Sequence, residues 1–197
     1  MSTATTKYTD ASLIYYQQGL SDKAVKERTE TTVKLANVTG KTASEVSEWM
    51  TAIWNNFDDG SKSLESYADT LAALGAATAS SASEIAGGLE KFAAIAETVG
   101  LSFEYSAAAL ATITAETRQS EEVVGTALKT IFSRMESLKL GDTLDDGTSL
   151  GQYAAALEKV GVNIKTAQGG LKDMDVILEE LGDRWTSLAR DEQVALA

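Results

Sequence analysis

The sequence contains no cysteine and no histidine, and these two absences exclude several kinds of chemistry. Without cysteine the chain has no disulfide, no thiolate nucleophile and no zinc site with sulfur ligands. Without histidine, Ser-His-Asp catalysis lacks its general base. Proline is absent as well, so long helices can form without the break that proline causes, and glycine is left to end them.

Positive charge is scarce, because 17 Lys and Arg face 29 Asp and Glu, which gives the 197-residue chain a net charge of −12. This balance opposes sequence-independent binding to nucleic acid, which depends on clustered cations, and binding to anionic lipid surfaces. No run of 18 consecutive apolar residues is present to span a bilayer. The N-terminal residues lack the apolar core of a secretory signal. We therefore expect neither nucleic-acid binding nor a membrane span.

The acidic residues do not fall in a pattern that predicts catalysis or metal binding. Residues 55–60 are similar to the front half of a calcium-binding loop, which needs a ligand at its third position and a bidentate acid at its twelfth. Those positions hold Phe57 and Ser66, and a second candidate loop that begins at Asp142 fails in the same way. No spacing of carboxylates selects an acid pair for glycosidic cleavage. We therefore predict no catalytic residue, no metal, no cofactor and no enzyme activity.

Apolar residues recur with an offset of 39 residues through the middle of the chain. They fall at steps of 4, 3, 1 and 3 within each copy, which is the buried stripe of an amphipathic helix. Such a period, with a second helix between the copies, predicts stacked helical hairpins; chance coincidence among short amphipathic helices is the alternative. The five columns are Val46, Ile85 and Val124; Met50, Leu89 and Leu128; Ile53, Phe92 and Ile131; Trp54, Ala93 and Phe132; and Phe57, Ala96 and Met135.

Side-chain chemistry marks where the helices begin and end. Residues 42–45 (Thr-Ala-Ser-Glu) and 81–84 (Ser-Ala-Ser-Glu) fit the capping box, in which hydroxyl and carboxylate each bond a free amide. Gly40, Gly60 and Gly100 stand where helices should end, since glycine enters the left-handed region at little cost. The pair at 87–88 is interpreted as a site of close helix packing. Together these signals predict helices near 21–38, 42–56, 61–78, 81–99, 102–116 and 120–138.

The pattern changes after about residue 138. Residues 141–147 are rich in turn-forming residues and predict a loop, and a helix follows over about 149–160. Val162 and Ile164 alternate with polar residues before a glycine pair at 169–170, which predicts a short β-hairpin or a folded-back extended loop. A further helix is expected to open at Asp173 or Asp175, and a last one near Asp191.

These observations predict a mainly α fold of alternating antiparallel helical hairpins, solenoid-like or bundle-like, with a small C-terminal helical part that contains the short hairpin or extended loop. The expected organisation has three parts: a helical lead-in at 1–40, the hairpin core at 41–140, and the loop, helix, hairpin and last helices at 141–197.

One dense aromatic cluster is a candidate interaction surface. Aromatic side chains dominate the contacts between protein partners, but the same residues would also serve as hydrophobic core, which is the interpretation that we favour. Trp49 lies one position away from the apolar stripe, and this favours a surface. The candidate oligomer or partner surface consists of Trp49, Ile53, Trp54 and Phe57.

From about residue 10 onward, a series of segments resembles the core region of phage tail tape measure proteins. Their order and spacing carry the resemblance, rather than any single motif. The segments are Tyr15–Leu20, Lys34–Val46, Met50–Phe57, Ala108–Thr112, Gly125–Arg134, Val160–Lys165, Gly169–Asp175 and Leu178–Leu181.

The resemblance implies a structural component of the virion of a long-tailed phage or prophage. Tape measure proteins template the length and assembly of the tail tube, occupy its interior and leave at DNA ejection. The implied partners are tail tube subunits, tail assembly chaperones and tail-tip proteins, with self-association of the full-length protein. The implied location is the tail tube interior, and the host cytoplasm during assembly. The resemblance supplies no catalytic residues.

As one continuous helix the chain would reach only about 300 Å, so we expect it to be one fragment of a longer protein. Two other hypotheses remain open. One is a stand-alone helical-repeat adaptor that binds a partner protein, and the other is a segment of a tail-tip muramidase, which would need an acid pair in a cleft.

Overall fold

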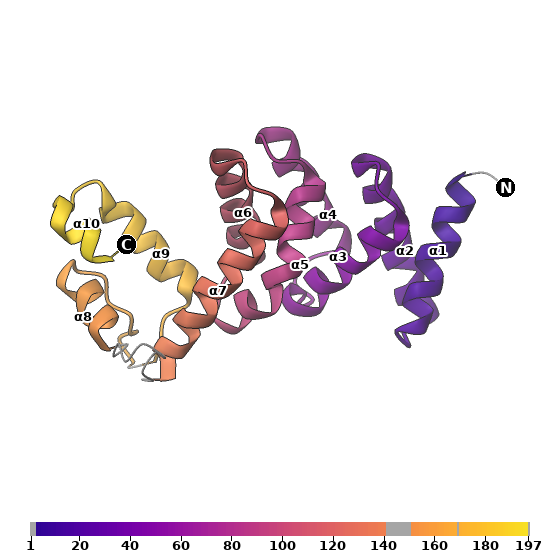
Figure 1. Ribbon diagram of the computed structural model, residues 1–197. Coiled ribbons are helices and arrows are strands. Elements are labelled where there is room, and N and C mark those ends of the chain that lie inside the picture. The colour runs from indigo at the N-terminus through magenta and orange to yellow at the C-terminus, as the bar shows by residue number, and fades with distance from the viewer. Residues whose placement is uncertain (1–2, 141–150, 169, 197) are drawn as a thin grey trace. The chain divides into compact units, whose positions relative to one another are not determined.

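The computed structural model describes residues 3–140, 151–168 and 170–196, and these residues are mainly helical (Figure 1). The mainly α prediction is confirmed. The helices of the described ranges are α1 (Thr3–Gln17), α2 (Asp22–Thr39), α3 (Ala43–Phe57), α4 (Leu64–Ala77), α5 (Ala82–Thr98), α6 (Phe103–Thr117), α7 (Glu121–Leu140), α8 (Gly151–Lys159), α9 (Met174–Trp185) and α10 (Arg190–Leu196).

The chain divides into two compact units, which are described separately. Unit 1 comprises Met1–Ala94 and Phe103–Leu128, and unit 2 comprises Ile95–Ser102 and Lys129–Ala197. The three-part organisation expected from the sequence stays a prediction. No helix in the described part of the chain is long and apolar enough to cross a membrane.

Both predicted capping boxes are present. The Glu45 amide donates to the Thr42 hydroxyl at 3.2 Å, and the Thr42 amide donates to the Glu45 carboxylate at 3.0 Å. Ser81 and Glu84 make the same two bonds at 3.2 and 2.6 Å. Hydrogen bonds from the Ser81 amide and hydroxyl lower the pKa of the Glu84 carboxyl. These local contacts explain why α3 and α5 begin one residue after the hydroxyl.

Helix ends also follow the sequence signals. Gly40, Gly60 and Gly100 have positive φ angles of 69°, 79° and 76°, so each uses the left-handed conformation that glycine adopts at little cost. Arg118 takes the same conformation after α6, with φ of 56°, and among the described residues it is the one non-glycine to do so. Its guanidinium donates to the carbonyl of Ala79 at 3.3 Å, which holds the turn against the end of α4.

The apolar stripe faces the core in α3 and α5, but one of its predicted members does not in α7. Ile53 and Phe92 are 0% and 1% exposed, whereas Ile131 in the same column is 50% exposed. The prediction for Ile131 is therefore wrong. The buried residues around it in α7, Leu128 and Phe132, lie four positions apart, so the buried stripe passes on either side of Ile131 without including it.

Helices α5 and α7 approach each other closely at glycine. A Cβ atom added at Gly125 would lie 2.6 Å from the carbonyl oxygen of Gly88. A Cβ atom at Gly88 would lie 2.5 Å from a methyl group of Leu110 in α6. The close helix packing predicted at residues 87–88 is therefore found, with Gly125 as the partner in α7. The start residues 43, 82 and 121 of α3, α5 and α7 fit the offset of 39, but the structural repeat itself stays a prediction.

In unit 2 the start of α9 is held by the turn that follows α5. The Met174 amide donates to the Val99 carbonyl at 3.1 Å, and the Ser102 amide donates to the Asp175 carboxylate at 3.2 Å. Gly100 fits there because a Cβ atom would lie 2.4 Å from Asp173. These contacts place α9 beside residues that lie about 75 positions earlier in the sequence.

The segment between α8 and α9 folds back on itself. The Thr166 amide donates to the Gly170 carbonyl at 2.7 Å, and the Lys172 amide donates to the Ile164 carbonyl at 2.9 Å. A single antiparallel bridge pairs Lys165 with Leu171, but the described residues form no strand here. The predicted β-hairpin is therefore not confirmed. The loop predicted at 141–147 and the first glycine of the 169–170 pair lie outside the described residues.

Candidate functional site

Two members of the candidate aromatic surface, Ile53 and Trp54, lie in the core of unit 1. Ile53 is 0% and Trp54 is 1% exposed. The Trp54 indole NH donates to the Leu64 carbonyl at 3.2 Å, which joins α3 to α4. The ring of Tyr15 packs at 6.2 Å from one side, and the guanidinium of Arg28 lies 5.0 Å from the Trp54 ring centre. These contacts hold the indole against α1, α2 and α4 within unit 1.

Trp49 and Phe57 lie at the margin of the same core. Trp49 is 9% exposed, and its indole lies beside α5, where a Cβ atom at Gly87 would be 3.7 Å from its nitrogen. Phe57 is half-buried and packs 5.8 Å from the ring of Phe103. As a partner surface the four residues stay an untested hypothesis. Their burial in this chain agrees with the interpretation that they form hydrophobic core. The agreement is strongest for Ile53 and Trp54.

A second aromatic contact joins α4 to α6 beyond Phe57. The rings of Tyr67 and Phe103 meet edge to face at 4.9 Å, and the Tyr67 hydroxyl donates to the Phe57 carbonyl at 2.9 Å. Burial raises the pKa of Tyr67 to about 12, with a further contribution from nearby acids. The ammonium of Lys62 lies 5.5 Å from the Tyr67 ring and pairs with Glu104. The phenol of Tyr67 therefore remains protonated at neutral pH, and these contacts join α4 to α6 and to the end of α3.

A buried polar contact attaches α1 to α2. The hydroxyls of Tyr15 and Thr32 lie 2.6 Å apart, and both residues are 0% exposed. Burial raises the pKa of Tyr15, while the hydrogen bond with Thr32 opposes that shift. Thr32 interrupts the apolar pattern of α2, and a sequence pattern that counts only apolar residues gives no sign that it is buried. Its burial becomes understandable once the phenol of Tyr15 is placed against it.

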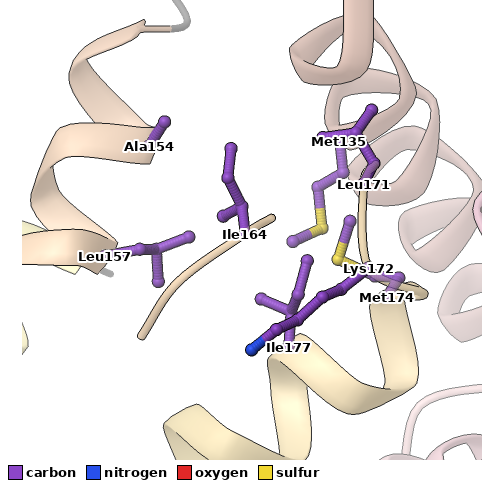
Figure 2. Close-up of a pocket in the computed structure, with 8 residues that line it drawn as sticks. All are labelled: Met135, Ala154, Leu157, Ile164, Leu171, Lys172, Met174 and Ile177. Atoms are coloured by element: carbon purple, nitrogen blue, oxygen red, sulfur yellow. The ribbon is translucent and has the colours of Figure 1, made fainter. Parts of the chain in front are cut away.

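Unit 2 contains a small, open apolar pocket. Figure 2 shows Ala154 and Leu157 of α8 on one side, Met135, Met174 and Ile177 on the other, and Ile164 between them. Leu171 and Lys172 complete the lining.

The Lys172 ammonium is engaged by both carboxylate oxygens of Glu180, at 2.6 and 2.8 Å. In this pocket the Lys172 ammonium is therefore paired with a carboxylate of α9. Among the residues that the structure describes, no three His, Cys, Asp or Glu side chains cluster so as to hold a metal ion.

Comparison with known proteins gives a family for the chain. No solved structure matches it. All of residues 1–197 match the family described as phage-related minor tail protein. Family membership implies contacts with other components of the tail and fits a location in the virion. With its helical framework and the whole of its length matched, this chain belongs to the phage-related minor tail protein family.

Proposed function

We propose that the chain is part of a tape measure protein, which templates the length of a phage tail tube from within and leaves the tube when DNA is ejected. The observation that carries the proposal is the match of the whole chain to a phage tail family. The mainly helical structure supports it, because the resemblance to tape measure proteins implies a mostly helical chain. On this proposal the role is structural rather than enzymatic, and the partners are tube subunits, assembly chaperones and tip proteins.

The net charge of −12 supports the same role. A protein that shares a tube with DNA and must leave it benefits from an acidic surface, because like charge keeps it from adhering to the phosphate backbone. The stacked-hairpin interpretation of residues 41–140 also belongs to this proposal. In such an array each 39-residue repeat contacts only its neighbours. Adding or removing a whole repeat would therefore change the length of the array while the other repeats keep their helix caps and packing.

The test is a change in the length of the encoded chain, made in the phage or prophage that carries it. Deleting residues 43–81 joins Thr42 to Ala82, so the sequence Thr-Ala-Ser-Glu of the capping box is restored at the junction. Duplicating the same residues is the matched opposite change. If the segment serves as a ruler, the deletion shortens the tail by up to about 60 Å, which is the length of 39 residues in a continuous helix, and the duplication lengthens it.

Tail lengths are measured on electron micrographs of purified virions. Tails of unchanged length in both variants would contradict the ruler role while leaving membership of the tail protein family intact. A change in the number of tails without a change in their length would indicate a role in assembly alone.

A further inference from the structure

Buried apolar side chains are distributed unequally between the two units. Among the described residues, every fully buried side chain larger than valine belongs to unit 1, including Trp54 and Tyr67. In the described part of unit 2 the larger buried side chains keep 4–5% of their surface exposed, and they are Leu101, Phe132, Met174 and Ile177. Because hydrophobic stabilisation grows with the apolar area removed from water, unit 2 has the smaller share of it.

The burial that α9 contributes to unit 2 is confined to its first turn. Met174 and Ile177 are the buried residues of this helix, and the eight residues that follow Ile177 in α9 are half-buried or exposed. Helix α10 contributes no buried residue over Arg190–Leu196. The attachment of α9 therefore depends mainly on its first four residues.

This first turn is bonded to the segment 95–102, which is the end of α5 with the turn that follows it. The Met174 amide donates to the Val99 carbonyl at 3.1 Å, and the Ser102 amide donates to the Asp175 carboxylate at 3.2 Å. The second bond is exposed to water, which competes for both partners. The bonded groups lie 73 or more residues apart in the sequence, so closing the loop between them costs entropy.

The small apolar pocket weakens the packing of α9 on another side. Figure 2 shows Met174 and Ile177 facing an open space, with Ala154 and Leu157 of α8 on its far side. Atoms that line an open space lack the contacts that a packed neighbour would provide. The first turn of α9 is therefore covered incompletely where it faces α8.

We propose that unit 2 opens separately, by release of the first turn of α9 from residues 95–102, while unit 1 stays folded. Opening of this kind takes least free energy where few apolar side chains are buried and backbone hydrogen bonds are exposed. Residues 95–102 continue into unit 1 at both ends, so they keep the support of a folded unit when α9 leaves. Helix α9 is thus a releasable strap on this turn, whether or not the chain has the tape measure role.

The first test is amide hydrogen exchange of the whole chain in increasing urea, followed by mass spectrometry of its peptides. Peptides from α9 and α10 should lose protection at lower urea than peptides from α3. In the absence of urea, the equilibrium constant for opening should be at least about a hundredfold larger for α9 than for α3, because α3 contributes seven buried residues and α9 two. Equal protection of α9 and α3 at every urea concentration would overturn the proposal.

Substitutions on α9 and on unit 1 test whether the two openings are separate. Met174→Ala should raise the equilibrium constant for opening of α9 at least about tenfold, which is about 1.4 kcal/mol, and leave the exchange of α3 unchanged. Val176→Ala is the matched control, since Val176 is 41% exposed on the same turn, and should change neither. Leu89→Ala, at a fully buried position of α5, should increase the opening of α3 and not that of α9.

If Met174→Ala increases the exchange of α3 as much as that of α9, the chain opens as one unit and the proposal is wrong. An α9 that is unaffected by Met174→Ala would also contradict it, because its first turn would then not hold it in place.

The three tryptophans allow an independent measurement on one sample. Trp49 and Trp54 lie in unit 1 and Trp185 lies in α9, so in Trp185→Phe the fluorescence reports unit 1 alone while far-UV circular dichroism reports the helices of both units. In urea, the loss of helix should begin at a lower concentration than the change in fluorescence. Coincident transitions in this variant would indicate two-state unfolding of the whole chain and would refute separate opening.

Discussion

Gly125→Ala should destabilise unit 1 relative to a matched alanine substitution nearby, although alanine is the better helix former. At this position the new Cβ atom would lie 2.6 Å from the carbonyl oxygen of Gly88 and 3.1 Å from the Cβ of Lys91. The first of these neighbours is backbone, so it cannot move away by changing rotamer, and α5 and α7 must separate. Overpacking of this kind costs about 1–3 kcal/mol, which offsets or exceeds the gain of about 1 kcal/mol from replacing glycine in a helix.

Gly87→Ala is the control, because it makes the same chemical change one residue from Gly88 without the clash. There the new Cβ atom would lie 3.4 Å from a side-chain carbon of Glu121 and 3.7 Å from the indole nitrogen of Trp49. The second distance is an ordinary contact, and the flexible Glu121 side chain can give way at the first. Gly87→Ala should therefore keep the gain in helix propensity, so the two variants should differ by about 1–3 kcal/mol in free energy of unfolding.

The assay is urea unfolding followed by far-UV circular dichroism, with the wild type and both variants measured together. The expected order of stability is Gly87→Ala first and Gly125→Ala last. A Gly125→Ala variant as stable as Gly87→Ala would refute the reasoning, because it would mean that α5 and α7 do not approach to backbone contact at Gly88.

Four further predictions rest on the packing of α7, the capping box of α5 and the net charge. Leu128→Ala should lower the free energy of unfolding by about 2–5 kcal/mol, as expected for a buried aliphatic side chain. Ile131→Ala should lower it much less, since Ile131 is 50% exposed. Thermal melts of the two variants, measured together, test the difference. Ser81→Ala should cost about 1 kcal/mol through loss of the cap. The pKa of Glu84 in the folded chain lies below the usual 4.5, so the carboxylate should contribute its full stabilisation above pH 4.5 and lose it as the pH falls below that value. Melting temperatures measured across this pH range should show the loss in the wild type and not in Glu84→Gln. In gel retardation at physiological salt the chain should not shift DNA, because 17 cations face 29 acids, and a tight shift would contradict this.

Helix boundaries were predictable from the sequence because they depend on neighbours within one turn. Thr42 and Ser81 each cap a helix with a glutamate three residues later, and Gly40 ends one with its own backbone conformation. Arg118 was not predictable in this way, because the left-handed conformation is unusual for a side chain with a Cβ atom. Its guanidinium bond to Ala79 connects two turns that lie 39 residues apart, and such a contact exists only after folding.

The candidate surface Trp49, Ile53, Trp54 and Phe57 could not be assigned from the spacing of apolar residues. The sequence placed Ile53 and Trp54 in an apolar stripe, but a stripe of aromatic residues is compatible with a core and with a partner surface. In this chain the Trp54 indole bonds to the Leu64 carbonyl and lies beside the ring of Tyr15, and these contacts agree with the core interpretation. Neither contact could be read from the spacing of apolar residues, because Leu64 and Tyr15 lie on other helices.

The sequence by itself determined the helical class, the places where most helices begin and end, and the acidic character of the chain, since each of these depends on composition or on residues close together in the chain. Only the tertiary structure decided how much of each stripe is buried, because burial depends on the number of helices that pack against it. Ile53 lies between neighbours and is covered, whereas Ile131 has the same place in the pattern and is exposed. Gly87 and Gly125 differ for the same reason, since only the approach of another backbone makes a Cβ atom at one of them costly.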